Sequence, residues 1–157
     1  MPTDKLRLPA VSDYAIPQGF NGSVWVAFTN KGRPVNVFVP DIGSAPDAMY
    51  FCHGLTLGTF HQYGYSVFSG WSVKRVLDDE YICVGGSVVN ARQGDIVSWQ
   101  QGGNVVHTCS IINVQAQPLS DHNAVVWTKN GIMPEVATSL QSVKNSYGQT
   151  YLIWRSR

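Results

Sequence analysis

The chain has 157 residues, of which 44% are hydrophobic and only 13% are charged, a composition typical of one compact domain rather than a disordered chain. Eleven Lys and Arg residues balance ten Asp and Glu residues, so the net charge is +1 and no basic run is available to follow a phosphate backbone. No hydrophobic run approaches the roughly 18 residues that a membrane span needs. We therefore expect one domain, with no nucleic acid and no membrane as partners.

The first 20 residues contain several prolines and small polar residues and show no hydrophobic period. This pattern predicts an extended arm over residues 1–20, followed by a single domain over residues 21–157. The arm lacks the apolar segment of a signal peptide. Three cysteines are too few for a disulfide framework. The sequence thus predicts a protein that is cytoplasmic or is exported by a route that needs no leader.

A hairpin and two helices are predicted in the first half of the chain from residue type and hydrophobic spacing. Ser44 is expected to cap the first helix, whose first turn tolerates Pro46. The predicted elements are hairpin strands 24–28 and 35–39 around a turn at 30–34, a short helix within 43–58, and a longer helix over 69–80.

The second half of the chain is a series of short β-branched and aromatic runs, separated by turn sequences rich in Gly, Asn and Asp. Helices in the first half followed by consecutive strands in the second half predict an α+β fold with an antiparallel sheet. The predicted strands are residues 81–84, 96–99, 105–114, 125–127 and 151–154.

Cys52 is the candidate nucleophile. It lies in the first segment predicted to be helical, and a helix N-terminus or a nearby imidazole lowers the pKa of a thiol and favours the reactive thiolate. Gly54 lets the backbone approach closely, so amide N–H groups are expected to face a developing oxyanion. The alternative is a structural cysteine, because a Cys between Phe51 and Leu55 also suits a hydrophobic core.

His107 is the candidate base. It begins an alternation in which His107, Cys109 and Ile111 share one face of a strand and Thr108 lies on the other. An imidazole on the inner face of a sheet needs a polar partner, and a thiolate from a neighbouring helix would be one. The alternative is a neutral, structural histidine that is hydrogen-bonded to the backbone.

Several short motifs follow one another in a characteristic order. They are Cys52-His53-Gly54, Gln93-Gly94-Asp95 ahead of a strand, His107-Thr108, Thr128-Lys129-Asn130-Gly131, and a closing segment from Tyr147 to Arg155. This order resembles the papain-like NlpC/P60 and CHAP peptidases and amidases. It is similar, more narrowly, to a bacterial group with Cys-His-Gly, His-Ser/Thr, Ser-Lys-Trp-Gly and a closing aromatic-Arg strand. The resemblance covers residues 45–155.

The resemblance implies a papain-like fold, in which short helices that carry the Cys pack on an antiparallel sheet that carries the His. It also implies a mechanism in which Cys52 attacks an amide carbonyl, His107 takes and returns a proton, and water hydrolyses the thioester. Relatives orient the His with a polar residue on or after the following strand. Asn130 is the predicted third catalytic residue, with Thr128 and Glu135 as alternatives, and Lys129 is excluded because a cation cannot accept a hydrogen bond.

His53, Gly54 and Thr128 are predicted to contact the substrate or the oxyanion. No metal site is predicted, because Cys and His do not recur at metal-ligand spacing, and no cofactor is expected. The predicted function is a cysteine-dependent hydrolase of peptide or amide bonds, with bacterial cell-wall peptide as the leading substrate. One alternative is a deamidase or protease effector that acts on a protein and has an inhibitor or immunity protein as partner. The other is a binding module without catalysis.

Overall fold

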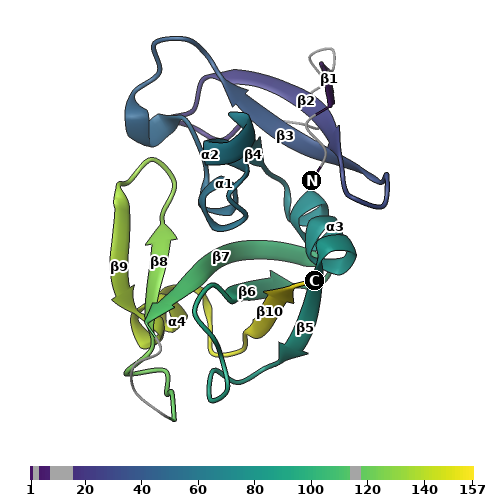
Figure 1. Ribbon diagram of the computed structural model, residues 1–157. Helices are drawn as coiled ribbons and strands as arrows, with labels where there is room; N and C mark the ends of the chain where they lie inside the picture. The colour runs from purple at the N-terminus through teal and green to yellow at the C-terminus, as the bar shows by residue number, and fades with distance from the viewer. Residues whose placement is uncertain (2–3, 8–15, 114–117) are drawn as a thin grey trace.

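The structure is a computed structural model that describes residues 1, 4–7, 16–113 and 118–157. Its described part is α+β, with two antiparallel sheets and four α-helices (Figure 1), which confirms the predicted class. Of the predicted arm, residues 2–3 and 8–15 lie outside the described residues. Lys5–Arg7 forms strand β1, which pairs with strand β2.

The first sheet has four strands in the order β1-β2-β3-β4. Its centre is the predicted hairpin, in which Thr29 N–H donates to the Arg33 carbonyl at the turn. The sequence pattern did not predict this sheet beyond the hairpin, because β4 has only two residues. The strands are β2 (Gly22–Phe28), β3 (Pro34–Pro40) and β4 (Ser66–Val67), together with β1.

The second sheet has six strands in the order β5-β10-β6-β7-β8-β9, and all neighbours are antiparallel. Five of these strands overlap the predicted strands, whereas β9 was not predicted. The strands are β5 (Tyr81–Gly85), β6 (Ile96–Gln101), β7 (Asn104–Asn113), β8 (Val125–Lys129), β9 (Glu135–Ser139) and β10 (Leu152–Ser156).

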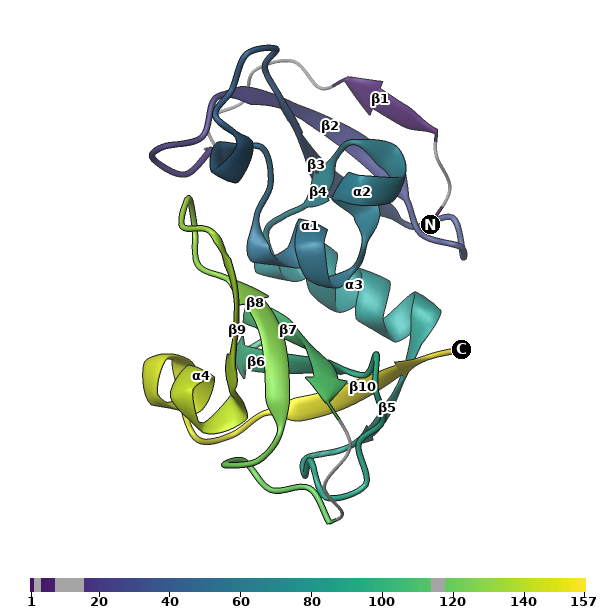
Figure 2. The same cartoon turned by 60° about the vertical axis from the view of Figure 1, so that its left-hand side comes forward.

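Three helices lie between the two sheets, and both ribbon views show this arrangement (Figures 1 and 2). The predicted longer helix is confirmed as α3, and the Ser69 hydroxyl caps it by accepting from the Ser72 N–H. The fourth helix, α4, packs on the six-stranded sheet next to β9 and was not predicted. The helices are α1 (Cys52–Thr56), α2 (Thr59–Tyr63), α3 (Gly70–Glu80) and α4 (Leu140–Tyr147).

The predicted capping of a short helix by Ser44 is wrong. Pro46–Ala48 forms a 3-10 turn without a side-chain cap, and helix α1 begins only at Cys52. The Ser44 hydroxyl donates instead to the Asp41 carbonyl, which satisfies it within its own turn. Ser and Asp side chains readily close such local turns, so a serine before a proline does not by itself identify a helix start.

The hydrophobic core has parts on both faces of the six-stranded sheet. One cluster joins the four-stranded sheet, α3 and the near face of the six-stranded sheet, and it includes Val37, Val67, Leu77, Ile96 and Val105. A second cluster lies on the far face, where α4 packs, and includes Trp99, Cys109, Ile111, Val126 and Leu140. A third cluster consists of four phenylalanines, Phe20, Phe38, Phe51 and Phe68. A register shift between β6 and β7 at Trp99 and Gln100 lets Val105 join the first cluster while His107 lies by Trp99.

Candidate active site

Cys52 is the first residue of α1. Phe51 before it is extended and provides no side-chain cap, so the helix has only its backbone N–H groups at this end. The residue is half-buried between the two sheets, and its thiol is free. A helix of five residues offers little of the macrodipole that would stabilise a thiolate.

The environment of the thiol keeps it protonated at neutral pH. Burial raises the pKa of the Cys52 thiol to about 11, against the effect of the Thr108 and His53 backbone N–H groups, the charge of Lys129 and the Thr108 hydroxyl. The predicted lowering of the Cys52 pKa is therefore wrong for the resting protein. The loss of solvation outweighs the short helix and the donors around the sulfur.

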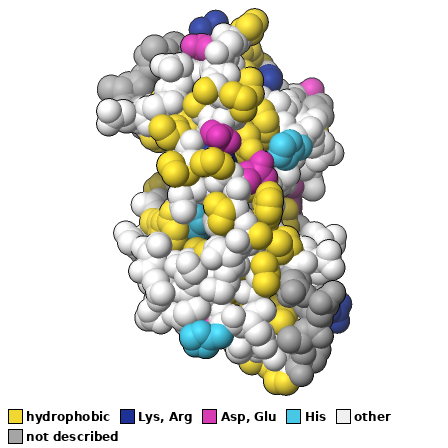
Figure 3. Space-filling model, turned by 90° about the vertical axis from the view of Figure 1, so that its left-hand side faces the viewer, with side chains coloured by type: hydrophobic (Ala, Val, Ile, Leu, Met, Phe, Trp, Pro, Cys, Tyr) yellow, Lys and Arg dark blue, Asp and Glu magenta, His cyan; other side chains and the backbone are white. Residues whose placement is uncertain are grey.

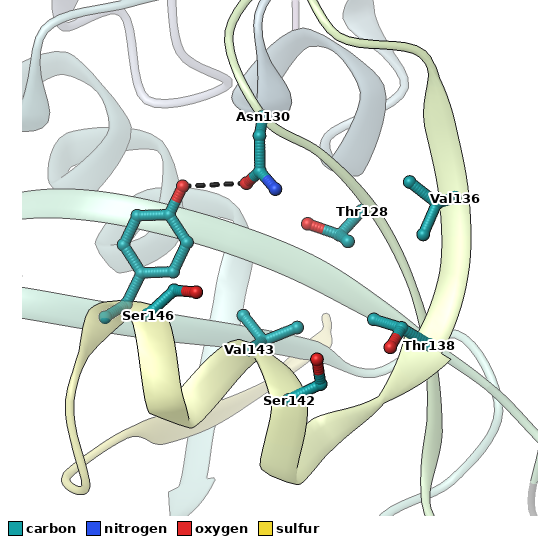
Figure 4. A pocket seen from close by; sticks show the side chains of 8 residues that line it. Thr128, Asn130, Val136, Thr138, Ser142, Val143 and Ser146 are labelled. Atoms are coloured by element: carbon teal, nitrogen blue, oxygen red, sulfur yellow. Dashed lines mark hydrogen bonds between the residues drawn. The ribbon is translucent and has the colours of Figure 1, made fainter.

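His107 is almost completely buried, at 1% exposure, and both its edge and its ring face have partners. Its Nε2 atom lies 2.7 Å from the Thr128 hydroxyl on β8. The Tyr147 ring stacks on the imidazole, with the two ring centres 3.9 Å apart and the planes within 3°. The Tyr147 hydroxyl donates in turn to the Asn130 amide oxygen at 2.8 Å, as Figure 4 shows. These contacts fix the orientation of the His107 ring.

Burial and, to a smaller extent, the nearby His53 lower the pKa of His107 to about 3. The imidazole is therefore neutral at physiological pH. A neutral imidazole is the form that a general base requires, so a thiol and an imidazole that are both uncharged remain compatible with proton transfer during attack. They do not form a resting thiolate–imidazolium pair.

Among the described residues, Cys52 does not contact the His107 ring, and the nearest link between the two residues is Thr108, which directly follows His107. Strands β7 and β8 pair as far as Ser110 and Trp127, and the register of the pair does not continue to Thr108 and Thr128. The Thr108 backbone N–H lies in this region and acts to lower the pKa of the Cys52 thiol. In the described part of the chain, no hydrogen bond joins the Cys52 sulfur to the His107 ring itself.

His53 does not take part in the contacts around His107. It is buried, and its Nδ1 atom lies 2.8 Å from the Thr108 hydroxyl. Burial lowers the pKa of His53 to about 4, so its ring is neutral as well. His53 thus connects α1 to β7 on the face of the strand opposite to His107, which is a local hydrogen-bonding position.

Gly54 has a packing reason to be glycine. A Cβ at this position would lie 2.1 Å from the Ser66 hydroxyl oxygen and 2.7 Å from the Ser66 Cβ, so α1 can approach β4 only without a side chain there. The predicted close approach of the backbone is therefore present, but it is made to Ser66. The role of Gly54 at an oxyanion remains a prediction.

Of the three predicted partners of His107, Thr128 is the one that contacts the ring, whereas Asn130 is hydrogen-bonded to Tyr147, which stacks on the ring. The third alternative, Glu135, accepts hydrogen bonds from the Tyr50 hydroxyl and, at 2.6 Å, from the Trp127 indole N–H. The geometry therefore favours Thr128 as the residue that orients His107, with Asn130 one contact further away.

Tyr147 was not predicted as a site residue, because its helix α4 was not predicted. The signal in the sequence was that Tyr147 is the first residue of the closing segment, which is one of the motifs that carry the resemblance. A cavity of about 130 Å³ opens behind Thr128 and Tyr147, between the β8–β9 hairpin and α4 (Figure 4). Its wall is formed by Thr128, Asn130, Val136, Thr138, Ser142, Val143, Ser146 and Tyr147.

Figure 3 shows the face of the molecule that carries this hairpin. The molecule narrows near its middle, and hydrophobic and acidic side chains gather there. Among the described residues, no group of three or more His, Cys, Asp or Glu side chains is placed to hold a metal ion. The site therefore offers a thiol, a neutral imidazole, hydroxyls and backbone N–H groups as its chemistry.

Comparison of the chain with protein-family models, with curated proteins and with solved structures finds no match in any of the three. In the described part of the chain, no helix is long and apolar enough to cross a membrane.

Proposed function

We propose that the protein is a cysteine-dependent amide hydrolase with a papain-like NlpC/P60 fold, in which Cys52 is the nucleophile and His107 the base. The observation that supports this best is the order of contacts around the two residues. The backbone N–H of Thr108, the residue after His107, acts on a thiol at a helix start and lowers its pKa against burial, and Thr128 contacts the His107 ring from the next strand. Nucleophile, base and orienting residue thus come from three elements that pack together, α1, β7 and β8.

In the proposed reaction, the Cys52 sulfur bonds to the amide carbon while its proton passes to His107. The imidazolium then protonates the leaving amine as the C–N bond breaks, which leaves a thioester on Cys52. Water attacks the thioester while His107 removes a water proton, and the imidazolium returns this proton to the sulfur as the C–S bond breaks, which releases the acid and restores the thiol. His107 must approach Cys52 during this cycle, since no hydrogen bond joins them at rest.

The substrate is a peptide-like amide, and cell-wall peptide is the leading class on the resemblance of the motifs. A deamidase or protease effector would use the same site on a protein, with an inhibitor or immunity protein as partner. Ammonia release from a protein target without cleavage of its chain would decide for the deamidase.

An activated ester tests the catalytic proposal without knowledge of the substrate. We expect wild-type protein to release more than one p-nitrophenolate per molecule from p-nitrophenyl acetate, and to carry the acetyl group on Cys52. Turnover should be lost in Cys52→Ala and fall about 100-fold in His107→Gln, since a general base contributes on the order of 10²- to 10⁴-fold. Cys83→Ala, at an exposed thiol, is the matched control. Turnover that is absent, or that survives in Cys52→Ala, contradicts the proposal.

A binding module without catalysis is the second candidate function. It is favoured by the uncharged state of both groups, since the pKa of the thiol is raised to about 11 and that of His107 is lowered to about 3. The absence of ester turnover would support this candidate.

A further inference from the structure

Lys129 is a fully buried lysine at the end of β8. Its Nζ atom donates to the Asp47 carbonyl at 2.5 Å and to the Gly131 carbonyl. The ammonium also lies over the Tyr50 and Phe20 rings, at 5.0 and 5.7 Å from their centres. Among the described residues, it forms no ion pair with a carboxylate.

A buried ammonium is costly unless an anion compensates the loss of water. Carbonyl dipoles and ring faces compensate in part, but they leave the net charge in place. The second buried lysine, Lys144, shows the usual solution, because its Nζ atom pairs with an Asp121 carboxylate oxygen at 2.6 Å. An anion that forms only transiently near Lys129 would therefore be stabilised by the uncompensated charge of its ammonium group.

The contacts of Lys129 place it beside the segment that leads into Cys52. Asp47 and Tyr50 lie five and two residues before the cysteine, and helix α1 packs on β8. The carboxylates of Asp47 and Glu135 also act on Lys129 electrostatically, but Glu135 is bonded to Tyr50 and neither forms an ion pair with the ammonium.

Among the described residues, Lys129 is the cation whose charge acts on the Cys52 thiol. The titratable groups that interact with Cys52 are Lys129, Cys109 and Tyr147, and the backbone of His53 donates to it. At neutral pH the thiol of Cys109 and the phenol of Tyr147 are uncharged, because burial raises the pKa of each group. The rings of His53 and His107 are neutral as well.

We infer that the Lys129 ammonium is the counter-charge that stabilises the Cys52 thiolate at the moment when the thiol loses its proton. The proton passes to His107, and Lys129 keeps its own. This inference deepens the proposed function, on which its catalytic meaning rests, but the stabilisation of a thiolate can be measured without any substrate.

Alkylation by iodoacetamide reports the thiolate fraction of each cysteine. The sulfur bonds to the CH₂ carbon as iodide leaves, and peptide mass spectrometry gives the rate at Cys52 between pH 7 and pH 10. An opposite charge nearby shifts a pKa by about 1 to 3 units, so Lys129→Met should slow alkylation of Cys52 at pH 8 by about 10-fold or more. Lys129→Arg keeps the charge and should retain most of the wild-type rate. The rate at exposed Cys83 should not change in either variant.

Lys144→Met is the matched control, because it removes a buried lysine that already has a carboxylate partner. Its Cys52 rate should equal that of the wild type. An unchanged rate in Lys129→Met, or an equal loss in Lys144→Met, would overturn the inference.

If Lys129→Met does not fold, Lys129→Gln decides, because its amide N–H groups can still donate to the Asp47 and Gly131 carbonyls but carry no charge. Alkylation of Cys52 at pH 8 should slow in Lys129→Gln as in Lys129→Met. A wild-type rate in Lys129→Gln overturns the inference. The ester assay separates this result from the proposed function. Slow alkylation in Lys129→Met, together with ester turnover that survives in Cys52→Ala, would refute the hydrolase and retain the counter-charge. An unchanged alkylation rate in Lys129→Met, together with ester turnover that is lost in Cys52→Ala, would retain the hydrolase and refute the counter-charge.

Discussion

The His107 ring has contacts on one edge and on one face, and each contact comes from a different element. Thr128 on β8 meets its Nε2 atom, and Tyr147 on α4 covers its face. Since the ring is 1% exposed, water cannot replace a partner that is removed. The edge contact should therefore contribute more to stability than an exposed hydrogen bond does.

Thr128→Val tests this contact, because valine keeps the shape of threonine and removes the hydroxyl. We expect the free energy of unfolding to fall by about 1 to 3 kcal/mol, the cost of an unsatisfied buried polar group. Urea denaturation measures this change. Thr128→Ser keeps the hydroxyl and should lose less, and Thr138→Val, in the same cavity but without a bond to His107, should change stability by about 0.5 kcal/mol or less. A cost in Thr128→Val no larger than that in Thr138→Val would show that the contact is unimportant.

Acid should destabilise the fold through its buried histidines. Burial lowers the pKa of His107 from 6.5 to about 3 and that of His53 to about 4. The unfolded chain binds these protons near pH 6.5, whereas the folded protein does not, so their effect on stability is absent above that pH and grows as the pH falls toward 3. Each histidine adds a slope of at most about 1.4 kcal/mol per pH unit.

His107→Gln should remove one of the two slopes. Urea denaturation at pH 7, 6 and 5 gives the free energy of unfolding of both proteins, and the difference between them should shrink or reverse as the pH falls. The carboxylates are common to both proteins and cancel in this comparison. Parallel pH curves for wild type and His107→Gln would show that the ring is protonated in the folded state.

At the scale of the elements, the position of α1 depends on its close approach to β4. A Cβ on Gly54 would overlap Ser66, so Gly54→Ala must push the helix and Cys52 away from the four-stranded sheet. We expect a loss of about 1 to 3 kcal/mol in the free energy of unfolding, measured by thermal or urea denaturation. Gly103→Ala is the control, because a Cβ there meets nothing within 4 Å.

The double variant Gly54→Ala with Ser66→Gly removes the overlap from the other side. It should recover part of the lost stability, because the two positions are in direct contact and their effects are not additive. If the double variant only adds the two losses, the overlap does not explain the glycine.

The elements that the sequence predicts are those with a strong local pattern. The hairpin has its turn residues at Asn30 to Pro34, and α3 has Ser69 as its cap and a clear hydrophobic face. Strand β4 has only two residues and gains its place from pairing with β3. Strand β9 pairs with all five residues of β8, so its register depends on the hairpin rather than on its own alternation.

The candidate site was also predictable only in part. The sequence identifies Cys52, His107 and the polar residues at the end of β8 and beyond it as candidates, because their residue types suit the chemistry. The choice between Thr128 and Asn130 depends on where β7 and β8 diverge, and the raised pKa of Cys52 depends on how deeply two sheets bury a short helix. Lys129 was excluded as a hydrogen-bond acceptor, and its burial could not be foreseen from a polar neighbourhood in the sequence. These properties arise from contacts between distant segments.

At the scale of the whole molecule, the two sheets share a core cluster, and polar contacts join α3 to the four-stranded sheet. The first core cluster contains residues of both sheets and of α3. At the end of α3, the carboxylate of Asp79 accepts from the Thr29 hydroxyl at 2.5 Å and from both the Nε and the NH2 group of Arg33, which lie at the turn of the β2–β3 hairpin. This connection joins the tip of one sheet to the helix that covers the other.

Asp79→Asn should therefore weaken the whole molecule and not the hairpin alone. The Asp79 side chain is buried, so loss of its charge leaves Arg33 and Thr29 with poorer acceptors, and we expect a cost of about 1 to 3 kcal/mol. Because the shared core couples the sheets, amide hydrogen exchange should accelerate by a similar factor in the slowest protons of both. Asp78→Asn is the control. Asp78 is the neighbour of Asp79 in the sequence and forms an exposed ion pair with Lys74, so its replacement should change stability by less than about 1 kcal/mol. Faster exchange confined to the four-stranded sheet would mean that the two sheets unfold separately, and the site between them would then open without loss of the six-stranded sheet.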